Sequence, residues 1–177
     1  LNTGVLTLGA GGDELLFAGG IDARDGASRP TSTIVNGNLR TAGASLLLNL
    51  VTLRGASTFD STNGGAEPGG GVIGVGAIGS SGNALTLDGG DGGAITVASL
   101  AGDGALTIAN SGATTFTGPV DASTVTLTDT QGVVAFEGDT TISDSLVTTT
   151  NGYGLSFTGT TNAVRAASPT VLQNTGA

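Results

Sequence analysis

The sequence contains no cysteine, histidine, lysine, methionine or tryptophan, and these absences exclude several kinds of chemistry. Without cysteine and histidine, the chain can form neither a thiolate nucleophile, nor a Ser-His-Asp triad, nor a zinc site of the usual nitrogen and sulfur type. Disulfides are excluded as well, so stability has to come from backbone pairing and from burial of apolar side chains. We therefore expect a protein that is not an enzyme, with no catalytic residue and no bound metal or other cofactor.

Positive charge is also scarce, because five arginines face 14 acidic residues and the net charge is −9. Residues 55–164 contain ten acidic residues and no basic one. Such a surface repels phosphate backbones and anionic lipids, so we expect no nucleic-acid partner. The longest apolar stretch, Leu46–Leu53, is too short to span a bilayer, which predicts no membrane insertion. The chain begins at Leu1 without a basic leader, so we expect any secretion signal to be removed or to lie outside this sequence.

Glycine and threonine dominate what is present, and glycine alone accounts for 33 residues. Both are poor helix formers, and no amphipathic helical stripe runs through a dozen residues without a glycine. Short alternations such as Leu85-Thr86-Leu87 and Ile95-Thr96-Val97 instead place apolar side chains on one face of a strand and threonine on the other. The sequence therefore predicts an all-β fold.

The strands repeat with a period of about 20 residues, which lies in the range of solenoid repeats. Three sets of apolar residues stay in phase over four repeats: Leu85, Leu106, Val125 and Leu146; Val97, Phe116, Phe136 and Phe157; and Leu100, Val120, Ile142 and Val164. A fixed period with about three short strands per unit is typical of a parallel β-helix, or β-solenoid, in which each coil stacks on the next. About eight or nine such coils would make a rod roughly 40 Å long. A β-sandwich is the alternative, because short strands at regular spacing suit that fold too.

Four of the five phenylalanines are followed two residues later by glycine. The pairs are Phe17 and Gly19, Phe116 and Gly118, Phe136 and Gly138, and Phe157 and Gly159. In a solenoid, the last three phenylalanines would form an aromatic stack along the axis.

Regularity divides the chain into three parts. Residues 1–63 contain strand-like segments at drifting spacing, which predicts irregular N-terminal coils. Residues 64–82 are rich in glycine and predict an extruded loop or a flexible connection. Residues 83–177 predict regular solenoid coils.

Two stretches carry a resemblance to a known group of proteins. They are SLAGDGALTIANSGATTFTGPVDASTVTLTD (99–129) and VVAFEGDTTISDSLVTTTNGYGLSFTGTTNAV (133–164), with the shared rhythm ALTI…TTFTG. They resemble the repeats of filamentous-haemagglutinin-like adhesins and autotransporter passengers. The resemblance implies a right-handed parallel β-helix, secreted to the surface of a Gram-negative-type bacterium, that acts as an adhesive or structural rod. It transfers no functional residue to this chain.

A candidate calcium motif lies in residues 9–25. Gly9, Gly11, Asp13 and Leu15 match a calcium-binding nonapeptide, and Gly20 and Asp22 recur nine residues after Gly11 and Asp13. A calcium site of this kind needs several consecutive repeats, and here Ala18 and Arg24 break the second one. An ordinary Gly-Asp turn is the simpler interpretation.

Two other groups of side chains could carry a function. Paired carboxylates could act as acid and base, and the candidates are Asp88, Asp91, Asp129, Asp139 and Asp144. A second group, Thr86, Thr107 and Thr126 with Thr148–Thr150, would form an outward ladder. Such a ladder could order water against ice, although threonine is also simply a polar residue that suits strands.

We expect a non-catalytic rod whose partners are a host or neighbouring cell surface, a glycan or other copies of the chain. One alternative is a subunit that stacks end to end into an extracellular filament or sheath, because exposed strand edges accept further strands. Another is a carbohydrate-binding module that uses residues 64–82 or the threonine face.

Overall fold

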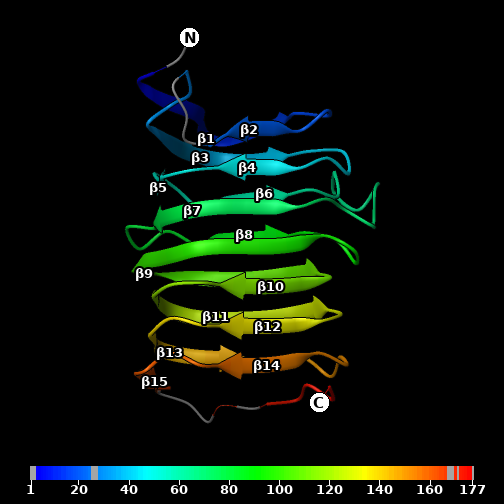
Figure 1. The fold of residues 1–177 in the computed structure, drawn as a ribbon, viewed down its shortest axis with the longest axis vertical. Coiled ribbons are helices and arrows are strands. Elements are labelled where there is room, and N and C mark those ends of the chain that lie inside the picture. The colour runs from blue at the N-terminus through cyan, green and yellow to red at the C-terminus, as the bar shows by residue number, and fades with distance from the viewer. Residues whose placement is uncertain (1–2, 25–27, 167–169, 171, 177) are drawn as a thin grey trace.

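The computed structural model describes residues 3–24, 28–166, 170 and 172–176, and it shows an all-β chain with no helix in these residues. Parallel strands stack as a β-solenoid of about seven turns with roughly 21 residues per turn (Figure 1). The strands are β1 (Val5–Leu16), β2 (Ile21–Ala23), β3 (Ser32–Arg40), β4 (Leu46–Leu48), β5 (Val51–Leu53), β6 (Ser57–Asp60), β7 (Ile73–Gly79), β8 (Leu85–Asp88), β9 (Ala94–Ser111), β10 (Ala113–Phe116), β11 (Val120–Thr130), β12 (Val133–Phe136), β13 (Thr140–Val147), β14 (Gly154–Phe157) and β15 (Asn162–Val164).

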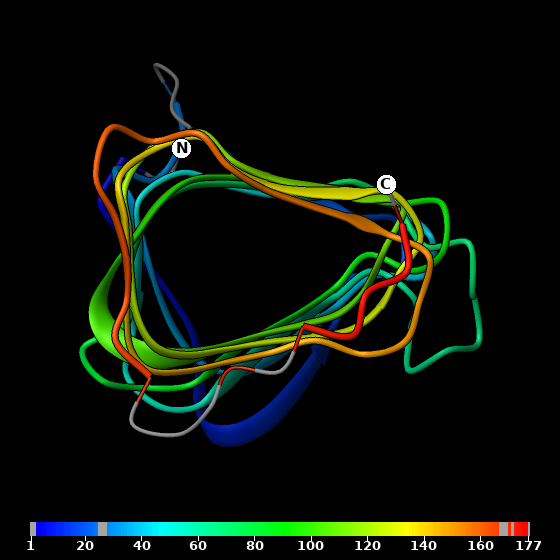
Figure 2. The same cartoon turned by 90° about the horizontal axis from the view of Figure 1, so that it is seen from below.

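Seen along the axis, the coils form a tube of roughly triangular cross-section (Figure 2). The first face holds β2, β4, β10, β12, β14 and the starts of β7 and β9. The second face holds β5, β15, the end of β7, the middle of β9 and the starts of β1, β3, β11 and β13. The third face holds β6, β8 and the ends of β1, β3, β9, β11 and β13.

Every ladder between these strands is parallel, which confirms the predicted solenoid and sets aside the β-sandwich. Alternation within each strand sends every second side chain into the tube, where Val, Leu, Ile and Phe form one buried core. No helix in the described part of the chain is long and apolar enough to cross a membrane.

Two of the three predicted columns are confirmed in register. Leu85, Leu106, Val125 and Leu146 lie opposite one another on the third face. Val97, Phe116, Phe136 and Phe157 do so on the first face.

The third predicted column is wrong by two residues. Val120 lies opposite Leu100 and Thr140, whereas Ile142 lies opposite Ala122 and Val164. Both Thr140 and Ile142 are buried, because residues two apart in a strand face the same side. The error arises because Thr140 faces inward although it is polar, so an alignment of apolar residues skips it.

The phenylalanine column is a continuous aromatic stack. The ring centroids of Phe116 and Phe136 are 5.0 Å apart, and those of Phe136 and Phe157 are 4.9 Å apart. The planes differ by 4° and 8°, so the rings lie parallel. Stacked rings at this spacing add cohesion beyond the burial of their area.

The glycines that follow these rings stack at the corner between the first and second faces. A Cβ on Gly138 would lie 2.1 Å from the Gly118 carbonyl carbon, and a Cβ on Gly159 would lie 2.3 Å from the Gly138 carbonyl oxygen. Successive coils approach so closely here that no side chain fits. At Phe116, Phe136 and Phe157 the Phe-x-Gly pattern therefore corresponds to one corner of the coil, where an inward ring is followed by a glycine that leaves room for the neighbouring backbone.

The glycine-rich segment 64–82 contains a loop and a strand. Residues 61–72 form turns that project from one corner of the tube (Figure 2), and Ser61 Oγ closes their base by donating to the Gly71 carbonyl oxygen at 2.9 Å. Residues 73–79, however, form β7, which pairs with β4, β5 and β9. The expected loop or connection thus covers only part of this range. Together with the C-terminal segment beyond β15, the loop explains why the chain makes about seven turns rather than eight or nine.

Candidate functional site

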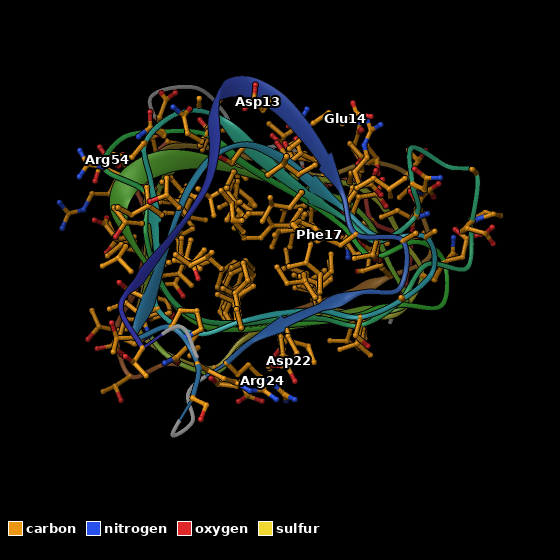
Figure 3. All side chains as sticks on the ribbon, turned by 90° about the horizontal axis from the view of Figure 1, so that it is seen from above. Asp13, Glu14, Phe17, Asp22, Arg24 and Arg54 are labelled. Carbon is orange, nitrogen blue, oxygen red and sulfur yellow. The ribbon has the colours of Figure 1, made fainter. Side chains whose placement is uncertain are left out.

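The candidate calcium motif is not assembled into one site. Asp13 and Asp22 lie on opposite sides of the first coil (Figure 3), because Asp13 belongs to β1 on the third face and Asp22 to β2 on the first face. Asp13 Oδ2 accepts a hydrogen bond from the Ala10 amide at 3.0 Å, as in an ordinary turn. Among the residues that the structure describes, no three acidic side chains are grouped so as to hold a metal ion.

Three of the five candidate carboxylates gather at one corner. Asp88 and Asp129 both lie opposite Asn110 on the third face. Asn110 Nδ2 also donates to Asp91 Oδ1 at 2.6 Å. The amide therefore separates the acidic side chains of neighbouring coils.

The other two candidate carboxylates lie elsewhere. Asp139 stands in the turn before β13, where its Oδ1 accepts the Thr161 amide at 2.8 Å. Asp144 lies within β13, and its Oδ2 accepts the Thr124 hydroxyl at 3.5 Å. The five carboxylates are thus not brought together into one acid and base pair.

The corner carboxylates belong to a longer row, which we call the polar ladder. Its members follow one another in register at the end of the third face: Arg40, Asp60, Asp88, Asn110 and Asp129. Asn151 extends the row by donating to Asp129 Oδ1 at 2.8 Å. Arg40, Asp60 and Asn110 are not among the candidates that the sequence singles out, although a polar residue at one place in each repeat is the signal that points to them.

Asp60 is the most buried charge of the polar ladder, with 3% of its surface exposed. Its Oδ2 lies 3.1 Å from Arg40 Nε and accepts the Gly64 amide at 2.7 Å. Its Oδ1 accepts the Thr62 amide and hydroxyl at 2.6 and 2.7 Å. Asp60 therefore ties the projecting loop to the coil.

Asp88 sits on the next coil of the ladder and has an altered pKa. Burial raises the pKa of its carboxyl, and the nearby charges of Asp60 and Asp91 raise it further. A hydrogen bond from the Gly90 amide to Asp88 Oδ1, at 3.1 Å, opposes this shift. Repulsion within the ladder is thus only partly relieved by Arg40 and Asn110.

The predicted threonine row is present on the third face, with one correction. Thr86, Thr107 and Thr126 lie opposite one another, and Thr58 extends the row. Thr148–Thr150 do not continue it: Val147 takes the next place and is 44% exposed, whereas Thr148 turns inward. A one-residue step in a strand changes the face of the sheet, which explains the exchange.

A groove with a volume of about 850 Å³ lies on the first face, over β7. This size lies within the range of small-molecule sites, about 300–1,000 Å³. The groove is lined by Arg24, Arg29, Leu47, Leu48, Asn49, Val72, Gly74, Val75, Gly76 and Thr96.

The groove exists because β7 carries glycine at its outward positions. Ile73 and Val75 point into the core, whereas Gly74 and Gly76, each of which follows one of them, face outward. The strands above and below carry Leu47 and Thr96 opposite Gly74. Because the outward positions of β7 lack side chains and those of the neighbouring strands do not, a trough runs along the sheet over β7.

Two of the five arginines stand at this groove and share one carboxylate. Arg24 Nε and Nη2 donate to Asp22 at 3.1 and 2.9 Å, and Arg29 Nη1 pairs with Asp22 Oδ1. These two arginines hold the pKa of Asp22 well below its usual range. The three described side chains of this cluster therefore carry two positive charges and one negative charge. The groove offers guanidinium donors, aliphatic carbon and polar side chains, which are contacts for binding a ligand.

Comparison of the chain with protein-family models, curated proteins and solved structures found no match.

Proposed function

We propose that the chain is a non-catalytic rod of a large secreted or surface-exposed bacterial adhesin, which holds attached parts at a distance and presents its outer faces to a partner. The observation that carries the proposal is the continuous stacking of coils. On the first face the same inward position runs in register from Ala23 through Val97 to Phe157. Ladders of this kind resist bending because every coil is bonded to the coils above and below.

The outer surface supports the same proposal. Outward threonines and the polar ladder keep two regions of the third face hydrophilic, and the net charge of −9 discourages sideways aggregation. The resemblance of residues 99–129 and 133–164 to adhesin repeats points in the same direction.

Adhesion of coated beads tests this proposal. Beads that carry the chain at one end are passed over immobilised cell-surface polysaccharides, and released reducing ends are measured in the same flow. Retention without new reducing ends supports an adhesive rod. If the beads are not retained and no reducing ends are released, the result supports a spacer. Release of reducing ends would overturn the non-catalytic assignment. Beads coated with heat-unfolded chain are the control for nonspecific binding.

End-to-end assembly is a second candidate, favoured by the strand edges at the two ends of the tube. Within the described residues, β2 pairs only with β4, and β14 pairs only with β12. Such edges accept a further coil or a second copy. Filaments in electron micrographs at rising concentration would support assembly of copies, and monodisperse short rods would exclude it.

A further inference from the structure

One outward column of the first face shows an unexplained glycine. The residues in register are Asp22, Leu47, Gly74, Thr96, Thr115, Ala135 and Ser156, and Gly74 is the one glycine among these seven. Threonine suits this place in a strand, whereas glycine inside a strand lowers stability relative to alanine.

Packing of the backbone does not require this glycine. A Cβ on Gly74 would meet only the Cδ2 of Leu47, at 2.9 Å, which is the end of a flexible side chain. Gly76 differs, because a Cβ there would lie 2.6 Å from the backbone oxygen of Asn49. Glycine inside a strand without a backbone reason is typical of a place that a ligand approaches closely.

The charge at the groove selects an anionic ligand. Among the described side chains at the groove, Arg24 and Arg29 exceed Asp22 by one positive charge, in a chain whose net charge is −9. Their side chains are 56% and 43% exposed, and the bonds to Asp22 use only two of the five N–H donors of Arg24. The planar guanidinium matches the two oxygens of a carboxylate.

The strands around the groove favour a sugar chain over a peptide. The first-face half of β7 is paired to β4 on one side and to β9 on the other, so a peptide cannot join the sheet there as an added strand. A ligand has to be held by side chains instead. Leu47 and Val72 offer aliphatic surface for the C–H faces of sugar rings, and Asn49 and Thr96 offer partners for hydroxyl groups.

We propose that the groove over β7 binds an acidic oligosaccharide, with the ring substituents over Gly74 and a sugar carboxylate at Arg24 and Arg29. This inference rests on the proposed adhesive role and names the class of ligand for it. The bond to the ligand is noncovalent, and the chain leaves the sugar unchanged.

NMR titration of the purified chain with tetragalacturonate tests the proposal, with maltotetraose as the neutral probe and tetraglutamate as the acidic peptide probe. We expect tetragalacturonate to shift the amides of β4, β7 and the start of β9, and maltotetraose to bind at least about tenfold more weakly, since it lacks the charged hydrogen bonds. Gly74→Thr should weaken tetragalacturonate binding by about tenfold or more, because the new side chain fills the trough.

Three further variants separate the contacts at the groove from general charge and folding effects. Arg24→Gln and Arg29→Gln should each weaken binding by about tenfold, the loss of one charge-assisted bond. Arg54→Gln removes the same charge from another part of the surface and should leave binding unchanged. Gly74→Thr should keep the native circular dichroism spectrum, because Thr96 and Thr115 already occupy the same column.

Three results would overturn the glycan assignment. They are no binding of tetragalacturonate at millimolar concentration by natively folded chain, equal losses in the Arg24 and Arg54 variants, or tighter binding of tetraglutamate through the same arginines. The proposed rod fails by a different result, the release of reducing ends in the bead experiment, so the two failures are distinguishable.

Discussion

The two halves of the solenoid follow the same architecture but differ in regularity. On the first face, Val97, Phe116, Phe136 and Phe157 follow one another at nearly even spacing in the sequence. In the N-terminal half, the members of the same column, Ala23, Leu48 and Val75, lie farther apart in the sequence. The additional residues form corners, the projecting loop and the segment that carries Arg29. The regular half therefore carries the aromatic stack, and the irregular half carries the projecting loop and the groove over β7.

The largest effect should come from breaking the regular half at the centre of its aromatic stack. Phe136 is fully buried between Phe116 and Phe157, so Phe136→Ala should lower the free energy of unfolding by about 4 kcal/mol through lost burial and a cavity. Urea unfolding measures the loss. Phe157→Ala is the matched control with a smaller expected loss, since Phe157 is only partly buried and stacks on one ring. Equal losses of unfolding free energy at the two positions would show that packing between two rings contributes no more than packing at the end of the stack.

The irregular half contains the buried carboxylate of Asp60, and Asp60→Ala tests what its contacts contribute. This change leaves Arg40 without its buried partner and removes the acceptor for the Thr62 and Gly64 amides, so we expect a loss of about 3 kcal/mol. Asp60→Asn keeps one carbonyl acceptor and should lose clearly less. Hydrogen exchange should also show earlier opening of residues 61–72 in Asp60→Ala. Unchanged protection of that loop would contradict the role given to Asp60.

The corner glycines allow the same substitution to be compared in the two halves. Gly138→Ala should cost about 2 kcal/mol, because its Cβ would collide with the Gly118 backbone. Gly19 occupies the same place in the Phe-x-Gly pattern, yet a Cβ there meets nothing within 4 Å, so Gly19→Ala should be neutral or slightly stabilising. Thermal unfolding of the two variants beside the wild type checks both. A cost at Gly19 equal to that at Gly138 would contradict the comparison.

Sequence periodicity predicts the regular half well because its inward residues are apolar and evenly spaced. The Leu85 and Val97 columns and the phenylalanine stack are confirmed residue by residue. The Leu100 column is wrong from Thr140 onward, because the sequence alone does not distinguish a buried threonine from an exposed one. Period alone fixes the face of a strand but not which of two inward residues lies opposite a given partner.

The irregular half and the groove are harder to predict because their features come from neighbours in space. The run Leu46–Leu53 divides into β4 and β5, which lie on different faces of the tube. Gly74 becomes notable only once Leu47 and Thr96 are known to lie opposite it. Arg24 and Arg29 are distant from β7 in the sequence, and only the stacking of coils brings them to its groove.

The smallest expected effect concerns the charge balance of the polar ladder, which links the two halves. Folding raises the pKa of Asp88 above its ordinary value of 3.8, so the folded chain holds this proton more tightly than the unfolded chain. The contribution of Asp88 to the free energy of unfolding therefore falls as pH rises from 3.8 through the folded value, and the full penalty is present above that value. Asp88→Asn imitates Asn110 and should raise the urea midpoint at pH 7, with little change at pH 3, where Asp88 is largely protonated in both states. A gain of equal size at both pH values would show that packing is responsible, and not the burial of a charged carboxylate beside Asp60 and Asp91.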